Sequence, residues 1–250
     1  MCINNVTLHL IGKKYIDRLL YIDKMKPSET NNINKIQDRL GGIFNITDSI
    51  PGIHPIYSSI GKKHTIIINE ITESRRTSLV RECDDLQASE AKLLRTAKHD
   101  LILNLMRSYD WTHIAYCDDV EYDFINKHAT NISSVDFCTT VSRHRFKGLI
   151  DQCNFIFDSR ERKHLYENLD TDTIIILHDP NGCEAIFKGI KVVEYNSPPP
   201  ISGLSVNGAG DIFAAVFIRE FITNDLKNAI LTSCEITTNL LKEKTKNEKI

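Results

Sequence analysis

The amino-acid sequence predicts an α/β protein built around a mainly parallel sheet. Short strand-like segments alternate with helical spacers through the second half of the chain, a pattern typical of parallel sheets with helices on both faces. The chain has 250 residues, of which 41% are hydrophobic, enough for one large domain with a sizeable core. We therefore expect residues 1–250 to form a single α/β domain.

The first half of the chain is expected to open with a strand. Residues 6–11 are strand-like and stop at Gly12, and a second extended stretch over 19–26 is broken by the polar segment after it. Residues 65–70 and 76–80 have strand composition and are joined by a polar turn, so they predict a β-hairpin.

The later elements are predicted from apolar spacing. Leucines between 89 and 109 fit one or two amphipathic helices, and the segments from Ile212 and from Leu226 to Leu241 have helical periodicity as well. The predicted strands of this half cover residues 113–116, 134–138, 155–157 and 173–177, with helical spacers at 145–152 and 160–168.

Charge and cysteine content exclude several classes of protein. The formal net charge of −2 leaves no basic footprint for nucleic acid. The seven cysteines are scattered, with no C-x-x-C pair, which favours reduced thiols over a disulfide framework or a zinc site. The N-terminus has no charged, apolar leader, and no apolar run reaches membrane-spanning length. We expect a cytoplasmic protein with neither a membrane nor a nucleic acid as partner.

The segment most informative about chemistry is the run from Ser205 to Asp211, which leads directly into a helical pattern. Gly208, Ala209 and Gly210 leave the backbone uncrowded, so their N–H groups and the positive end of the helix dipole can hold an anion. A carboxylate such as Asp211 beside a phosphate is suited to take a proton from an attacking group. The alternative is an ordinary helix start in which Asp211 caps the first N–H groups.

Two upstream segments contain candidate ligand-binding residues. Asp17 follows the first predicted strand, at the edge where α/β proteins meet their ligands, and it could bind hydroxyls or be a solvated turn residue. Gly41 and Gly42 permit a close approach of the backbone, and Asn45 can both donate to and accept from a diol. The same residues could instead form a turn before a helix near Phe44.

A pair of acidic residues follows the predicted strand at 155–157. Asp158 and Glu161 could hold Mg²⁺ through its waters, because this ion prefers oxygen ligands and keeps much of its hydration shell. Equally well, they could form a capping box at the start of a helix. From the residues alone both interpretations stay open.

The string Ser205-Val206-x-Gly208-Ala209-Gly210-Asp211, with Ala215 four residues on, resembles the C-terminal signature of the ribokinase family of sugar and nucleoside kinases, also called the PfkB family. Gly12 with Asp17, and Gly41-Gly42 with Asn45, are similar to its N-terminal motifs. The resemblance implies a three-layer α/β/α sandwich with a small β-sheet lid. The lid strands would be inserted at about residues 18–30 and 64–81.

The resemblance also implies roles for individual residues. Asp211 would be the catalytic base, and Gly208, Ala209 and Gly210 would form the anion hole. The acceptor would be bound by Asp17, Gly41, Gly42 and Asn45. ATP would contact Asn207, Gly182 and Asn239, and Asp158 with Glu161 would organise Mg²⁺. The lid strands of such kinases can also build a homodimer interface.

Together these features predict an ATP-dependent phosphotransferase acting on a hydroxyl of a sugar or related small molecule. Within the same superfamily, the acceptor could instead be a nucleoside or a vitamin precursor. A third hypothesis is a degenerate, non-catalytic member that binds a ligand and regulates. It is motivated by Asp158, where the family has Asn, and by Ser205, where relatives often have an acid.

Overall fold

The computed structural model describes residues 5–46, 50–72, 75–82, 109–116, 132–137, 150–197 and 207–248. These residues contain ten strands and two α-helices, together with two short 3-10 helices. The strands are β1 (Val6–Ile22), β2 (Lys35–Gly42), β3 (Ile53–Glu70), β4 (Arg75–Glu82), β5 (Trp111–Ile114), β6 (Ser134–Asp136), β7 (Phe155–Ser159), β8 (Ile174–Asp179), β9 (Gly182–Phe187) and β10 (Ile190–Asn196). The helices are η1 (Ile43–Asn45), η4 (Arg160–Leu165), α4 (Ala209–Phe221) and α5 (Leu226–Glu248).

All ten strands belong to one mixed sheet, ordered β10-β9-β8-β7-β6-β5-β1-β3-β4, with β2 paired to β1 off this path. Neighbours from β8 to β3 run parallel, whereas the hairpins at both ends, β8-β9-β10 and β3-β4, are antiparallel. The expected parallel sheet is therefore confirmed, as is the hairpin over residues 65–80, in which Glu70 pairs with Arg75.

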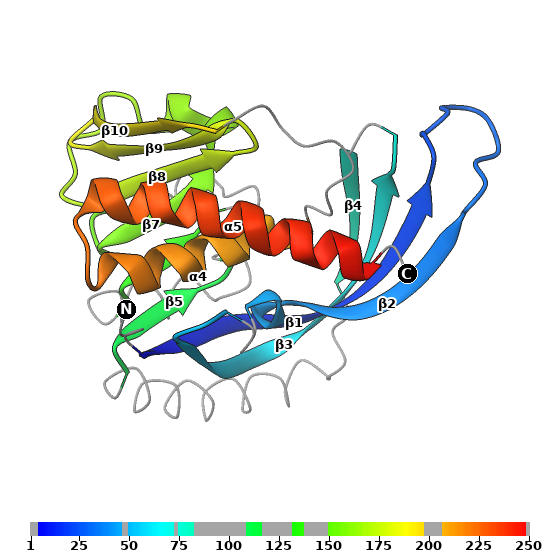
Figure 1. Cartoon of the computed structure of the whole chain (residues 1–250), viewed down its shortest axis with the longest axis horizontal. Helices are drawn as coiled ribbons and strands as arrows, with labels where there is room; N and C mark the ends of the chain where they lie inside the picture. The colour runs from blue at the N-terminus through cyan, green and yellow to red at the C-terminus, as the bar shows by residue number, and fades with distance from the viewer. Residues whose placement is uncertain are drawn as a thin grey trace.

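A β-lid extends from the main sheet and is formed by the outer halves of β1 and β3 together with β2 and β4 (Figure 1). The prediction that the first strand ends before Gly12 is wrong, because β1 continues to Ile22. A register shift between Gly12 and Lys14 marks the passage from sheet to lid. Beyond it β1 is hydrogen-bonded to β2 and β3, and this pairing keeps it extended.

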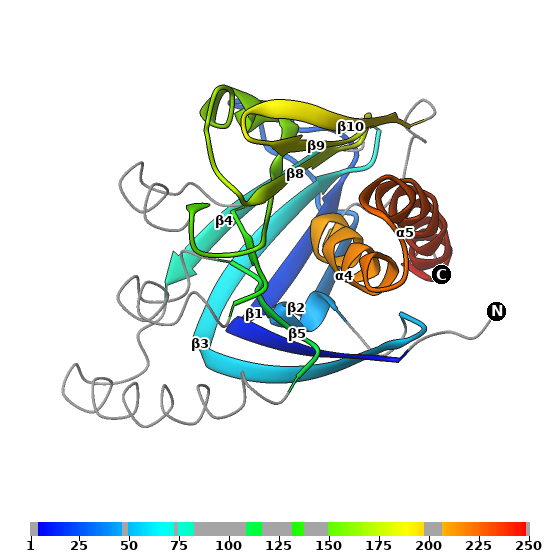
Figure 2. The same cartoon turned by 90° about the vertical axis from the view of Figure 1, so that its left-hand side faces the viewer.

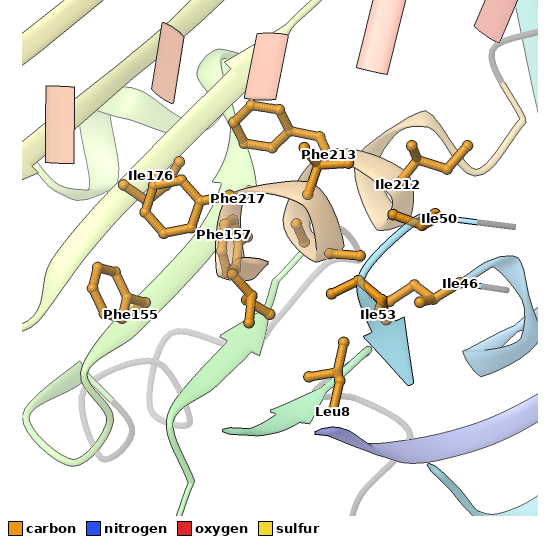
Figure 3. Close-up of a cluster of buried hydrophobic side chains, with 14 of the residues drawn as sticks. Leu8, Ile46, Ile50, Ile53, Phe155, Phe157, Ile176, Ile212, Phe213 and Phe217 are labelled. Carbon is orange, nitrogen blue, oxygen red and sulfur yellow. The ribbon is translucent and has the colours of Figure 1, made fainter. Parts of the chain in front are cut away.

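Two apolar clusters lie on opposite faces of the sheet, as the period-2 alternation of strands requires. Phe157 belongs to one cluster and its neighbour Ile156 to the other. Helices α4 and α5 pack side by side over the Phe157 face (Figures 1 and 2). Phe213 and Phe217 from α4 lie edge-on against Phe157, and Figure 3 shows this core.

Helices α4 and α5 confirm the predicted C-terminal helices, and the N-terminus of α5 is held by Asp225, which accepts from the Asn228 N–H at 2.8 Å. The spacer predicted at 160–168 is the short helix η4 instead. The helices predicted at 89–109 lie outside the described residues. In the described parts of the chain, no helix combines the length and hydropathy needed to cross a bilayer.

Candidate active site

The centre of the candidate site is the turn that begins α4. Gly208 is the N-cap residue and has φ 75° and ψ 15°, a left-handed conformation that favours glycine. As a glycine, the N-cap residue has no side chain with which to cap the helix start. The first N–H groups of α4 and the positive end of its dipole are therefore directed to one place, the geometry of an anion site.

Gly208 also lies against Asn45, and this contact joins the two ends of the sequence. A Cβ atom at position 208 would come within 3.0 to 3.2 Å of the Asn45 side chain. Glycine is needed here both for its backbone conformation and for the space that Asn45 occupies.

The carboxylate of Asp211 is buried, with 4% of the residue exposed. Asn45 Nδ2 donates to Asp211 Oδ2 at 2.8 Å, and the Tyr116 hydroxyl donates to the same oxygen at 3.0 Å. Because Gly208 is the N-cap, the interpretation of Asp211 as an ordinary N-cap residue is wrong. The side chain is instead held by residues from two distant segments.

Asn45 reaches Asp211 through an unusual backbone turn. Strand β2 ends at Gly42, whose φ of 64° permits the short helix η1 to begin immediately. A Cβ at Gly42 would come within 2.7 Å of the Tyr15 ring. The predicted turn before a helical segment is seen at the Gly41-Gly42 pair, whose backbone closely approaches the side chains of Asp17 and Tyr15. Its close approach to a ligand stays a prediction.

Asp17 lies on the lid, in the middle of β1, with 2% of the residue exposed. Thr65 Oγ1 donates to Asp17 Oδ1, and Arg39 Nε lies 3.7 Å from Asp17 Oδ2. A Cβ at Gly41 would overlap the Asp17 carboxylate. Asp17 is thus no solvated turn residue, and it lies in contact with the glycine pair that leads to Asn45.

Asn207 connects the turn to the lid and to the last helix. Its Nδ2 donates to Asn69 Oδ1 of β3 at 3.0 Å, and its carbonyl accepts from Lys244 Nζ of α5 at 2.5 Å. The residue is fully buried. These bonds fix the segment that enters the Gly208 turn.

His178 and Tyr116 are site residues that the sequence did not reveal. A Cβ at Gly210 would lie 3.1 Å from His178 Cε1, and the His178 ring packs on Phe213 with 5.0 Å between centroids. Its Nε2 is buried and has no hydrogen-bond partner in the described residues. Burial lowers the pKa of His178 to about 4, so the ring is neutral at pH 7. In the sequence, His178 follows a predicted strand and is given no catalytic role, and Tyr116 is only the end of a predicted strand.

Asp158 lies away from this site, on the opposite face of the sheet. It is part of β7, where Phe157 faces α4 and the next side chain faces the other cluster. Asp158 is 1% exposed, accepts from Arg162 Nε at 2.6 Å and from the Tyr166 hydroxyl at 2.5 Å. The helix cap is Ser159, which accepts from Glu161 N–H at 3.3 Å, so the expected capping box at Asp158 is wrong.

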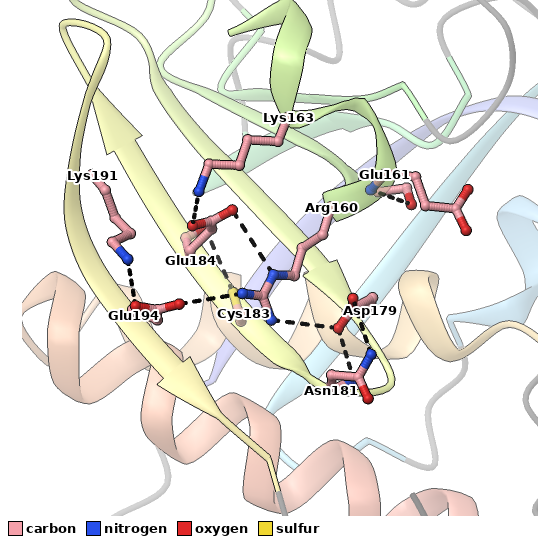
Figure 4. A network of polar contacts seen from close by, with 10 residues as sticks. Arg160, Glu161, Lys163, Asp179, Asn181, Cys183, Glu184, Lys191 and Glu194 are labelled. Carbon is pink, nitrogen blue, oxygen red and sulfur yellow. Dashed lines mark hydrogen bonds and ion pairs between the residues drawn. The ribbon is translucent and has the colours of Figure 1, made fainter. Parts of the chain in front are cut away.

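The expected magnesium pair does not fit an ion in this arrangement. The oxygens of Asp158 are taken up by Arg162, Tyr166 and the Ser159 N–H. Glu161 is exposed, and its carboxylate points away from the neighbouring ion-pair network of Arg160 (Figure 4). Among the described residues no group of three His, Cys, Asp or Glu side chains could hold a metal.

The remaining two predicted nucleotide residues are also apart from the turn. Gly182 begins β9 in the tight β8-β9 hairpin, with φ 145° and no room for a Cβ beside the Tyr195 carbonyl. Asn239 is exposed on α5. The structure therefore brings together Asp17, Gly41, Gly42, Asn45, Asn207, Gly208, Ala209, Gly210 and Asp211, and leaves Asp158, Glu161, Gly182 and Asn239 outside this cluster.

Comparison with protein-family models finds no match, and comparison with curated proteins finds none either. Solved structures do match over most of the chain. Phosphofructokinase-2 from Escherichia coli, in a tetrameric inhibited form, has a TM-score of 0.63 at 10% identity and covers 97% of both chains. A nucleoside kinase from Methanocaldococcus jannaschii gives 0.63 at 12% identity, covering 96% of this chain and 92% of its own.

Arabidopsis thaliana ribokinase, solved with ribose and ATP, gives a TM-score of 0.55 at 12% identity and covers 90% of this chain and 88% of its own. These matches confirm the expected ribokinase-like fold. At identities of 10 to 12% they support the fold only.

Proposed function

We propose that this chain, on its ribokinase-like fold, is an ATP-dependent phosphotransferase that phosphorylates a hydroxyl of a sugar or related small molecule. The observation that supports this most directly is the buried Asp211 carboxylate in the first turn of α4, held by Asn45 and Tyr116. A carboxylate beside a bound phosphate is repelled by it, and accepting a proton from the attacking group is a role that requires a carboxylate in this place.

The reaction follows from this geometry. Asp211 takes the proton of the acceptor hydroxyl as its oxygen attacks the terminal phosphorus of the donor. The N–H groups at Gly208, Ala209 and Gly210 stabilise the charge that develops on the transferred group. Asn45 and Tyr116 both donate to Oδ2 and hold the carboxylate in place. Mg²⁺ would accompany the nucleotide and neutralise phosphate charge.

The acceptor end of the site lies under the lid. Asp17, the Gly41-Gly42 backbone and Asn45 form a continuous row from the middle of β1 to Asp211. Carboxylate, amide and backbone groups are suitable partners for vicinal hydroxyls. We assign these residues to the acceptor, and we assign Asn207 with the Gly208 turn to the phosphate donor.

The donor is proposed to be ATP. Arabidopsis thaliana ribokinase, which shares the fold, was solved with ribose and ATP. In this chain the adenine would lie toward α5 and the β8-β9 hairpin, where Asn239 and Gly182 are found.

Replacement of Asp211 by Asn tests the proposal. The variant should lower turnover by roughly 10²- to 10⁴-fold, because general base catalysis is lost, while ATP binding measured by calorimetry stays close to wild type. Asp172→Asn, at a carboxylate with 88% of its side chain exposed, is the matched control. Near-normal turnover of Asp211→Asn would remove the residue from this role.

A panel of acceptors decides between the sugar and the other classes. Sugars, sugar phosphates, nucleosides and hydroxymethylpyrimidines would each be incubated with ATP while ADP formation is followed. Turnover with a nucleoside or pyrimidine alone would move the assignment to that acceptor. Ligand binding without phosphoryl transfer to any member would favour the non-catalytic, regulatory alternative, which Asp158 and Ser205 motivate.

The outer face of the lid is proposed to be covered by a second copy of the chain. Ile36, Leu40, Ile66 and Leu79 lie on this face with 42 to 59% exposure, around the Arg18–Asp38 ion pair. The matched Escherichia coli enzyme is a tetramer, so this fold can assemble. Light scattering should show that Ile66→Lys reduces the mass to that of one chain, whereas Ile190→Lys, at an exposed isoleucine of β10, does not.

The cytoplasm is the compartment we propose. None of the described cysteines, Cys153, Cys183 and Cys234, forms a disulfide. This supports a reducing environment.

A further inference from the structure

Tyr116 follows β5 at the carboxyl edge of the sheet, directly beside β1. The backbone is held there because Ala115 N–H donates to the Ile11 carbonyl at 3.1 Å. The side chain is half-buried and directs its hydroxyl to Asp211 Oδ2 at 3.0 Å. Residue 116 thus reaches the α4 turn from a different strand end than Asn45 does.

We propose that Tyr116 is a positioning residue for Asp211, whose phenolic hydrogen bond orients the carboxylate and keeps it ionised for proton transfer. The inference rests on the proposed role of Asp211 as base and adds a residue to it. Tyr116 has no part in the motifs of the sequence, so it is visible only in the fold.

The chemistry of the contact supports this role. A phenol can only donate to an ionised carboxylate, and a hydrogen bond to a charged group stabilises that charged form. The hydroxyl and the Asn45 amide converge on one oxygen, so together they restrict the orientation of the carboxylate. A base that must stay unprotonated in a buried site needs such donors.

Stacking, and not the hydrogen bond alone, determines where the Tyr116 ring lies. The rings of Tyr15 and Tyr116 are 5.3 Å apart with an interplanar angle of 18°, and Tyr15 in turn lies on Gly42. Removal of the hydroxyl alone should therefore leave the ring in position. Tyr116→Phe is accordingly a clean probe, and Tyr15→Phe removes a hydroxyl from the other ring of the same stack as the matched control.

The first readout is the pH dependence of kcat/KM for the acceptor that the panel identifies. In Tyr116→Phe the Asp211 carboxylate has lost a hydrogen-bond donor, so its pKa should rise. The acid limb of the kcat/KM profile should therefore move upward by about one pH unit or more. The rate should be about 10-fold below wild type at pH values under the wild-type limb and within a few-fold of wild type well above it, with the KM for ATP unchanged. Tyr15→Phe should keep the wild-type limb. Superimposable profiles for wild type and Tyr116→Phe would overturn the inference.

The second readout needs no turnover, and it separates this inference from the proposed function. Carbon-13 NMR of labelled aspartate carboxyls, with Asp211 identified by its loss in Asp211→Asn, gives the titration midpoint of Asp211 without substrates. An upward shift in Tyr116→Phe supports the contact even if no acceptor is phosphorylated. Turnover with an unmoved midpoint and an unmoved acid limb would refute the Tyr116 role and leave the kinase assignment in place.

A second variant, expected to shift the titration midpoint of Asp211 in the opposite direction, tests the proposal if Tyr116→Phe does not fold. Fluorotyrosine at position 116 keeps the ring and makes the phenol a stronger donor. The midpoint of Asp211 should then move downward, and an unchanged or raised midpoint would contradict the proposal.

Discussion

Asn45 Nδ2 donates to Asp211 Oδ2 at 2.8 Å and joins two residues separated by 166 positions in the sequence. Asn45 ends a short helix after the lid strand β2, and Asp211 lies in the first turn of α4. This bond connects the lid segment to the carboxylate at the Gly208 turn. We assign the lid segment to the acceptor and the turn to the phosphate donor.

Asn45→Asp is expected to place a second carboxylate against Asp211. The substitution keeps the side-chain shape but replaces a donor by a like charge, so one of the two acids should become protonated. The folded state then favours the proton-bound form. We expect the variant to melt at a lower temperature than wild type at pH 8, and we expect the difference between the two melting temperatures to become smaller toward pH 5. Asn34→Asp is the control, since Asn34 donates to Asp23 in an exposed pair where solvent screens the charges. Equal effects of both substitutions would contradict a buried contact at Asp211.

Gly208→Ala is expected to weaken both the fold and the site. The left-handed backbone at φ 75° costs a non-glycine residue roughly 1 kcal/mol or more, and the added Cβ would press on Asn45. Urea unfolding should show a loss of about 1 to 3 kcal/mol, and turnover should fall because Asn45 is displaced. Gly210→Ala is the comparison, because that helical position has no positive φ and meets only the edge of His178. A Gly208→Ala protein as stable as wild type would argue against the turn described.

Arg162→Ala is expected to reveal Asp158 as a structural residue. Asp158 is 1% exposed and forms its ion pair with Arg162, so loss of the guanidinium leaves a buried charge without its cation. Unfolding free energy should fall by about 3 to 5 kcal/mol, whereas Glu161→Ala, at an exposed carboxylate, should change it by less than about 0.5 kcal/mol. Equal stability losses in the two variants, or a stability that depends on added Mg²⁺, would restore the metal interpretation of this pair.

The features that sequence predicted well are those encoded by short local patterns. Gly208 and Gly210 before an apolar helix predict the turn whatever the helix packs against. The strand composition at 65–80 predicts the hairpin in the same way. Gly41 and Asn45 are also marked by a local signal, a glycine pair before an amide, whereas Asp17 is predicted as a carboxylate after a strand and in fact lies within β1. These residues do converge in the fold.

The features that could not be predicted from the sequence depend on pairing between distant strands and on which face of the sheet a strand residue points to. Gly12 resembles a strand end, but β1 continues past it because β2 and β3 pair with its outer half. Asp158 resembles a residue at the mouth of a helix, but β7 extends to Ser159, and this extension places Asp158 on the face opposite α4. Tyr116 and His178 approach the turn from separate strands, and their places at strand ends do not indicate that contact in the sequence.

Among the described residues, the buried His9 and His113 and the partly buried His178 should make the fold sensitive to acid. Burial lowers the pKa of His9 to about 4, of His113 to about 3 and of His178 to about 4, from an ordinary value of 6.5. Below pH 6.5 the unfolded chain binds protons that the folded chain refuses, so stability falls with decreasing pH until about pH 4. Each histidine can lower the free energy of unfolding by at most about 1.4 kcal/mol for each pH unit of acidification.

The test is His113→Gln, which removes one of these groups while retaining a side chain that can bond to Ser134 Oγ. Urea unfolding between pH 6 and pH 4.5 should show a slope of stability against pH that is smaller than wild type by about one proton. Carboxylates also titrate in this range, but their contribution cancels in the difference between variant and wild type. His164→Gln, at an exposed histidine, should leave the slope unchanged. Parallel slopes for His113→Gln and wild type would show that His113 is not held neutral in the folded chain.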